Sequence, residues 1–292
     1  MIGIREITRG RFGNRILQYN SLMQLSRQFS IDAYCSEWEG HQWFEDIVKP
    51  QCSDIRPCYN ITWKEVLSGE YLRLLENNEH CVIGEYVMHN FFYDITKLSP
   101  KIFLKLKKEY LPVFPSDSKN IGIHIRGDDI RGADGNNCRE VHSFQYYRDA
   151  IDLIASKEKI DSVHLCTDDT DFDLFVNVES YACEVFGRHN VHRGKSTLNR
   201  SLPHIFDFGT LSECDYLVAS SSTYAVTAGF IGKRKKIIHS EDWINKNTPG
   251  QGYVAWGKYT SDYPAQYWTQ YDKFWQRVRE FNNEHYEPWA IV

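Results

Sequence analysis

The chain has 292 residues, 42% of them apolar, and a formal net charge of -5. This length exceeds what one small core needs and suits two packed domains of ordinary size. The acidic balance excludes a general nucleic-acid binder, which needs a basic face to neutralise phosphates. No run approaches the ~20 apolar residues that span a bilayer, and the N-terminal MIGIREITRG has no signal-peptide core. We therefore expect a cytoplasmic protein without a transmembrane anchor or a nucleic-acid partner.

The eight cysteines are scattered along the chain and form no C-x-x-C pair. An even number permits disulfides, but without an export signal we expect reduced thiols. The same spacing disfavours a structural zinc site. Cysteine chemistry is therefore not expected to carry the function.

The first part of the sequence gives few clear elements. A short strand is predicted at IGIREI, and the glycine loop RGRFGNR leads into a helix over 16–29. CVIGEYVM favours a strand over 81–88, and SPKIFLKLKKEYL favours a helix over 99–111 with Pro100 near its start. Two prolines make LPVFPSDSKN a predicted linker to the second half.

From residue 121 onward the pattern becomes regular, with strands and helices in alternation. This alternation is typical of a parallel α/β sheet, which is the fold class that we expect. The predicted strands are 121–126, 162–168, 216–222 and 235–240. The predicted helices are 143–157, one that starts within 170–177, 204–215 and 224–232.

The end of the sequence is rich in aromatic residues. AQYWTQYDKFWQRVREF predicts a long helix over 265–281 with a large apolar face. We expect a packing helix that clamps the two domains. A platform on which sugars stack is the alternative that the aromatic stripe leaves open.

Polar side chains gather where three of the predicted strands end. In parallel sheets, ligands bind in the crevice outside the carboxyl ends of the strands, so these residues point to one site. They are His124, Arg126, Asp168, Asp169, Ser220, Ser221 and Ser222.

The serine turn and the arginine suit a phosphate group. In YLVASSSTYAVTAG a strand leads through three serines into a helix, whose N-terminal N–H groups carry partial positive charge. An ordinary helix cap explains the serines equally well. Arg126 offers a permanent cation with a planar fork of donors for a diphosphate, and His124 falls on the same strand face. The alternatives are an ion pair of Arg126 with Asp128 or Asp129, and a core histidine at 124.

The acidic run TDDTDFD resembles a calcium loop without meeting its requirements. Leu174 stands where that loop needs glycine, and no bidentate glutamate follows, so we predict no metal site. Asp171 is interpreted as the acid at a helix N-terminus. Asp168 or Asp169 could accept hydrogen bonds from a base with adjacent N–H groups, as guanine has.

The glycine loop around Gly13 excludes two common cofactor motifs. GRFGNR is not G-x-G-x-x-G, so a nicotinamide or flavin cofactor has little support. It is not a P-loop either, because no Gly-Lys-Ser/Thr follows. A simple turn between strand and helix would also explain it.

Taken together, the motifs resemble those of the fucosyltransferase superfamily. GRFGNRILQY resembles the glycine-Asn loop of α1,2- and protein O-fucosyltransferases, and GIHIRGDD resembles their H-x-R-R-x-D motif. VHLCTDD and LSECDYLVASSSTYAVTAGF resemble later motifs that are shared with the α1,6-fucosyltransferases. The four motifs stand in the family's order, and residues 31–118 show none.

The resemblance implies a GT-B fold, with two Rossmann-like domains facing across a cleft and a C-terminal helix packing back. An N-terminal domain over 1–118 would be the acceptor side, and one over 119–250 would bind the nucleotide sugar. Residues 251–292 would form the aromatic helical tail. The implied activity is an inverting transfer of L-fucose from GDP-fucose to a glycan hydroxyl, without a required metal or cofactor.

The resemblance also implies roles for residues of the nucleotide domain. Arg126 matches the motif arginine that contacts the donor diphosphate, and His124 matches the motif histidine near the nucleotide. Asp168 or Asp169 matches the acid that recognises the base. Arg126 is thereby a predicted catalytic residue as well as a binding residue.

The serine turn and the glycine loop match the family in a similar way. Ser221 and Ser222 match the serines on the phosphate side, with Ser220 beside them. Asn14 matches the loop asparagine that faces donor and acceptor, and we count it as catalytic. Gly13 belongs to the same loop and is placed with the donor-binding residues.

The sequence departs from the family at one position. Gly127 stands where the family has a second arginine, so one cation is missing from the motif. Arg131 could replace it, or the donor could be another nucleotide sugar such as UDP-xylose. A non-catalytic carbohydrate-binding protein is the alternative from another class, although a lectin does not need a diphosphate site.

A general base is expected on the acceptor side, because a hydroxyl is a poor nucleophile near neutral pH. Glu140 is the candidate, since it follows the strand that carries Arg126 and precedes the helix at 143. Its spacing to His142 does not match the α1,6-fucosyltransferases. An acid stabilised by a helix dipole is the alternative, and Asp129 and Glu85 are weaker candidates.

Overall fold

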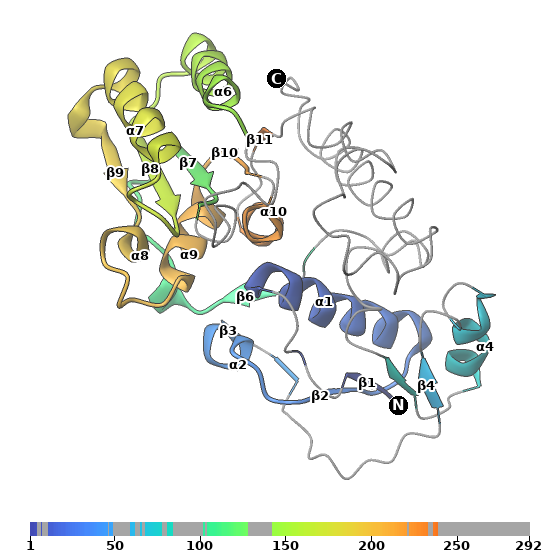
Figure 1. Cartoon of the computed structure of the whole chain (residues 1–292). Helices are drawn as coiled ribbons and strands as arrows, with labels where there is room; N and C mark the ends of the chain where they lie inside the picture. Colours follow the sequence, from blue (N-terminus) through green and yellow to red (C-terminus); the bar gives the residue numbers. More distant parts are fainter. Residues whose placement is uncertain are drawn as a thin grey trace. The chain divides into compact units, whose positions relative to one another are not determined.

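The computed structural model shows an α/β protein with two compact units (Figure 1). Described residues up to Lys107 belong to the first unit, and those in 108–238 belong to the second. The predicted α/β class is confirmed. The structure describes residues 1–4, 7, 11–45, 47–48, 59–61, 65, 68–77, 81–83, 102, 104–127, 142–220, 222–232 and 236–238.

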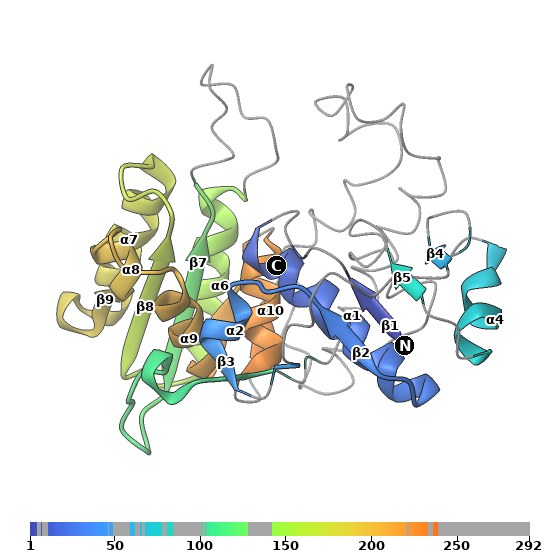
Figure 2. The same cartoon turned by 90° about the horizontal axis from the view of Figure 1, so that it is seen from below.

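The first unit is built on a parallel four-stranded sheet with the order β2-β1-β5-β4. Ile2 and Ile4 of the central strand β1 are fully buried, which explains why this apolar stretch forms an inner strand. The long helix α1 lies along β1 and β2 (Figures 1 and 2). The elements are β1 (Ile2–Ile4), α1 (Phe12–Phe29), β2 (Ala33–Cys35), α2 (Gly40–Trp43), β4 (Tyr59–Ile61), α4 (Glu70–Glu76) and β5 (Cys81–Ile83).

Helix α1 begins four residues earlier than the sequence predicted. Gly13 and Asn14 therefore lie in the first helical turn and not in a loop. Both residues are poor helix formers, which is why the pattern suggested a loop. The first turn tolerates them because its N–H groups have no intrahelical acceptor, and local propensity there is easily overridden.

The helix predicted over 99–111 is wrong where the structure describes it. Lys105–Leu106 forms strand β6, paired antiparallel with β3 (Phe44–Glu45), and Lys108–Tyr110 forms a single 3-10 turn, η1. Ile102, Leu104 and Leu106 are all buried, so the apolar residues alternate with a period of two. A period of two is typical of a strand. The apolar run is too short for its length to distinguish a strand from a helix.

The second unit holds a parallel five-stranded sheet with the order β11-β10-β7-β8-β9. It contains every strand and helix predicted from 121–238, and additionally β9, η3 and α8, which were not predicted. The strands are β7 (Asn120–Ile125), β8 (Ser162–Thr167), β9 (Val191–Arg193), β10 (Tyr216–Val218) and β11 (Lys236–Ile238). The helical elements are α6 (Phe144–Lys157), α7 (Asp173–Phe186), η3 (Arg188–Asn190), α8 (Lys195–Leu198), α9 (Ile205–Glu213) and α10 (Thr223–Ile231).

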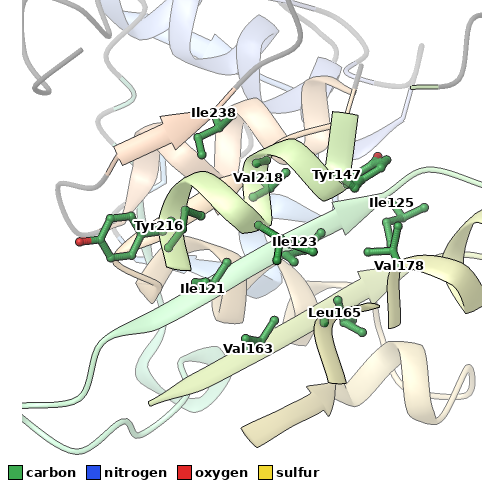
Figure 3. Close-up of a cluster of buried hydrophobic side chains, with 14 of the residues drawn as sticks. Ile121, Ile123, Ile125, Tyr147, Val163, Leu165, Val178, Tyr216, Val218 and Ile238 are labelled. Atoms are coloured by element: carbon green, nitrogen blue, oxygen red, sulfur yellow. The ribbon is translucent and has the colours of Figure 1, made fainter. Parts of the chain in front are cut away.

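Helices cover both faces of this sheet. Ile121, Ile123 and Ile125 of β7 pack with residues of α6 and α7 into one buried cluster (Figure 3). Gly122 points the other way, because a methyl group there would lie 2.9 Å from Leu211 of α9. Figure 1 shows α6 and α7 on one side of the sheet and α9 and α10 on the other. His124, two residues after Gly122, therefore belongs to the α9 and α10 face.

Three further predictions concern Asp171, the aromatic helix near the end of the sequence, and a membrane span. Asp171 is not the first-turn acid of its helix, since α7 begins at Asp173 after the N-cap Phe172. The aromatic helix over 265–281 lies outside the described residues. In the part of the chain that is described, no helix is both long and apolar enough to cross a membrane.

The described cysteines form no disulfide. Cys35, Cys81, Cys166 and Cys214 are buried thiols, and Cys183 is half-buried. Burial raises the pKa of Cys35 to about 12, so this thiol stays protonated near neutral pH. These five side chains act as packing residues.

Candidate functional site

The strand order of the second unit reverses between β7 and β10. From β7 the chain passes through α6 to β8 and through α7 to β9, and then returns to the opposite side of β7 as β10. In open parallel sheets, the connections on the two sides of such a point leave in opposite directions, so the carboxyl ends of the two strands form an edge that commonly binds a ligand.

One hydrogen bond joins the two strand ends at the reversal. His124 Nδ1 lies 2.6 Å from Ser220 Oγ, across 96 residues of sequence. Both side chains are buried, with 7% and 2% of their surface exposed. The imidazole also packs against Tyr224 of α10, with ring centroids 5.1 Å apart. The structure thus brings together two of the predicted residues that come from different strands.

Arg126 and Gly127 follow β7 directly, at the same edge. Arg126 is half-buried, and the N–H of Gly127 donates to Asp168 Oδ1 over 2.8 Å. This bond ties the segment after β7 to the segment after β8. A methyl group at position 127 would lie 2.6 Å from Cβ of Asp169, which leaves no room for a side chain there.

The acids after β8 hold their own turn together. The N–H of Asp169 donates to Thr167 Oγ1 over 3.1 Å, and the N–H of Asp171 donates to Asp169 Oδ1 over 3.1 Å. Asp169 also forms a 3.7 Å ion pair with Arg200. Among the described residues, no group of three or more histidine, cysteine or acidic side chains is arranged to hold a metal ion.

The serine turn after β10 leads into α10 as predicted. Ser222 is the N-cap, and its hydroxyl accepts from the N–H of Tyr224 over 3.3 Å. The carbonyl of Ser220 accepts from the N–H of Ser222 over 2.7 Å. Ser222 therefore does act as an ordinary helix cap, at the N-terminal end of a helix that starts beside His124. Ser221 lies outside the described residues.

Asp207 of α9 is part of the site's framework and was missed in the sequence. Its buried carboxylate accepts from the N–H of Ser196 and of Thr197, each over 2.8 Å, and from the Thr197 hydroxyl over 2.6 Å. Thr197 Oγ1 in turn accepts from the N–H of Thr167, the residue before Asp168. Burial raises the pKa of Asp207, and these hydrogen bonds oppose the rise. The lone acid in the apolar helix HIFDFG was the signal that could have revealed it.

The remaining predicted site residues lie in the first unit or outside the described residues. Gly13 and Asn14 belong to α1 of the first unit. Glu140, Asp129 and Glu85 lie outside the described residues, as does Arg131. The described cluster at the strand ends therefore comes from the second unit alone.

No family model matches the sequence, and no curated protein matches it. Among solved structures, the chain is distantly similar to several, including three at 14% identity or less, each with a TM-score below 0.5. One is POFUT1 with GDP-fucose, at 9% identity over 80% of this chain and 95% of that chain, with a TM-score of 0.48. Another is FUT1 of Arabidopsis thaliana with GDP, at 14% identity over 86% and 72%, with a TM-score of 0.49. A third is the E. coli ADP-heptose heptosyltransferase II, at 10% identity over 81% and 83%, with a TM-score of 0.44.

Proposed function

We propose that the protein is an inverting glycosyltransferase that transfers L-fucose from GDP-fucose to a glycan hydroxyl. The observation that carries the proposal is the buried hydrogen bond between His124 and Ser220 at the strand reversal, with Arg126 two residues further along. The N-terminus of α10 begins at the same edge, where the helix dipole adds partial positive charge. A cation, a helix N-terminus and polar side chains at one edge of the sheet suit a nucleoside diphosphate.

In the proposed reaction, the acceptor oxygen attacks the anomeric carbon while the bond to the diphosphate oxygen breaks. Negative charge grows on the departing diphosphate, and Arg126 would stabilise it. The acceptor proton passes to a base, for which Glu140 is the candidate. His124 is held in one orientation by Ser220 and would contact the nucleotide. Asp168 or Asp169 would receive hydrogen bonds from the base, and Asn14 would face donor and acceptor.

The first experiment identifies the donor. Thermal unfolding is measured with GDP, UDP, GDP-fucose and UDP-xylose, because a ligand of the folded state raises the melting temperature. We expect stabilisation by GDP and GDP-fucose. Stabilisation by the UDP compounds alone would move the donor to a UDP-sugar, the alternative that Gly127 leaves open. Binding of free glycans without any nucleotide would instead favour a carbohydrate-binding protein.

The second experiment tests the cation. Arg126→Ala should lose ~10²–10³ of the transfer rate, as removal of one group that stabilises a developing charge typically does. The variant should keep the melting temperature of the parent, which separates a catalytic loss from misfolding. Transfer by Arg126→Ala at the parent rate would overturn the assignment.

Transfer by the parent protein should also survive excess EDTA, since the protein itself supplies the positive charge.

The third experiment concerns the base. Glu140→Gln keeps the shape of the side chain and removes its ability to take a proton. We expect unchanged affinity for the donor and a turnover lowered by ~10² or more. Unchanged turnover would remove Glu140 from the mechanism, and the same measurement on Asp129→Asn and Glu85→Gln would then decide between the weaker candidates.

A further inference from the structure

The environment of Gly127 excludes a cation at that position. Its N–H is held by Asp168, and a methyl group on its Cα would lie 2.6 Å from Cβ of Asp169 and 3.4 Å from Oδ1 of Asp168. The first contact is with an atom next to the backbone, so no change of rotamer relieves it. A diphosphate carries more than one negative charge, and a second cation at this site must come from elsewhere in the chain.

Arg200 contacts the residues after β8 from another segment. Its guanidinium lies 3.7 Å from Asp169 Oδ1 and donates to Thr170 Oγ1 over 3.4 Å. Asp169 is the residue against which Gly127 packs. The Arg200 side chain is 60% exposed, whereas that of Asp169 is 14% exposed. An incoming anion has access to the Arg200 guanidinium.

The segment from Gly194 to Pro203, which carries Arg200, is held by hydrogen bonds near both of its ends. The N–H of Gly194 donates to the carbonyl of Leu165 in β8 over 2.8 Å. Asp207 caps the following short helix α8, and Ser196 Oγ donates to the carbonyl of Pro203 over 2.7 Å. A guanidinium on such a segment loses less conformational freedom on binding than one on a loose loop.

We propose that Arg200 supplies the second cation of the donor site and contacts the diphosphate of the nucleotide sugar. The proposal rests on the proposed function. Because Gly127 leaves no room for a cationic side chain beside Arg126, the segment after α8 would supply that cation. Asp169 orients the guanidinium, and an arriving phosphate takes the outer donors of its fork.

Calorimetric titration with GDP and GMP tests the contact. We expect Arg200→Ala to weaken GDP binding at least ~10-fold and GMP binding less, because GMP lacks the outer phosphate. Arg200→Lys keeps the charge without the planar fork, so its GDP affinity should lie between those of the parent and Arg200→Ala. Arg148→Ala is the matched control, an exposed arginine with an ion pair to Asp152 on α6. It should bind both nucleotides like the parent.

Three outcomes overturn the proposal, and they are distinguishable. If the parent binds GDP and Arg200→Ala binds it equally well, Arg200 is a surface ion pair only and the proposed function stands. If Arg131→Ala weakens GDP binding and Arg200→Ala does not, the second cation is Arg131. If the parent binds neither GDP nor UDP, the proposed function fails together with the inference.

Discussion

Residue 127 lies where the segments after β7 and β8 touch. Ala at this position would press its methyl group against Asp169 and disturb the bond from the N–H of residue 127 to Asp168. We expect Gly127→Ala to weaken GDP binding ~10-fold and to lower the free energy of unfolding by about 1–3 kcal/mol, the usual cost of overpacking. Calorimetry and urea unfolding measure the two effects.

Gly122→Ala is the matched control for this variant. It adds the same methyl group within β7, five residues before Gly127, where its nearest neighbour is the end of the Leu211 side chain at 2.9 Å. It should lower stability and leave nucleotide affinity unchanged. Equal affinity for GDP in Gly127→Ala and the parent would show that the geometry at 127 does not matter for the donor.

The predicted site residues were recognisable where they follow a strand. His124 and Ser220 stand at the ends of two apolar runs, so their meeting was predictable from the parallel sheet alone. The role of Asp207 was not predictable, because a single acid within a helix does not indicate which backbone groups of a neighbouring segment it will bind. The role of Gly127 also depends on a contact between two loops, which no local pattern encodes.

At the scale of elements, the first turn of helix α6 is held both by its own N-cap and by a hydrogen bond to the residue after β10. Ser143 caps it by accepting from the N–H of Tyr146, whose hydroxyl donates to the carbonyl of Ala219 over 2.7 Å. Ser143→Ala should cost about 1 kcal/mol in the free energy of unfolding, as loss of an N-cap does. Urea unfolding followed by circular dichroism measures this.

Ser156→Ala provides the comparison for that change. Ser156 lies near the end of the same helix, and its hydroxyl donates only to the carbonyl of Leu153 within the helix. Its removal should change the unfolding free energy by less than ~0.5 kcal/mol, as exposed substitutions usually do. If the two variants unfold alike, the cap contributes no more than an ordinary surface serine.

The regular second unit was largely predictable, and the first was not. Amphipathic patterns of 14 residues, as in α6 and α7, carry enough repeats to define a period. The strands of the first unit, β6 among them, have two or three residues each, and β9 of the second unit has three. Strands this short contain no full repeat, so their pairing partners decide their conformation, as β3 does for β6.

At the scale of the whole molecule, His164 couples stability to pH. Burial, and next the nearby His192, lower the pKa of its imidazole from 6.5 to about 4. Its ring also contacts Phe114 and lies 2.8 Å from Ser162 Oγ. The unfolded chain therefore binds a proton at a higher pH than the folded protein does. The stabilisation is complete above pH 6.5 and is lost as the pH falls from 6.5 towards 4.

We expect the second unit to lose stability over this interval, by up to about 1.4 kcal/mol for each pH unit from this group. His164→Gln cannot take up a proton, so its unfolding free energy should fall less steeply between pH 7 and pH 4.5. His189→Gln changes an exposed histidine of the same unit and should follow the parent. Parallel pH profiles for the parent and His164→Gln would contradict the coupling.

The strand order of the second unit has a consequence for how the chain acquires its structure. Asn120 and Asp215 exchange hydrogen bonds across 95 residues, from the N–H of Asn120 to Asp215 Oδ2 and from the N–H of Asp215 to the carbonyl of Asn120. During synthesis, β7 pairs with β8 well before β10 exists, and its other edge waits unpaired while about 50 further residues are made after β8. Such distant pairing slows folding, and an open apolar edge invites association with other chains. A chain truncated before β10 should therefore aggregate rather than fold.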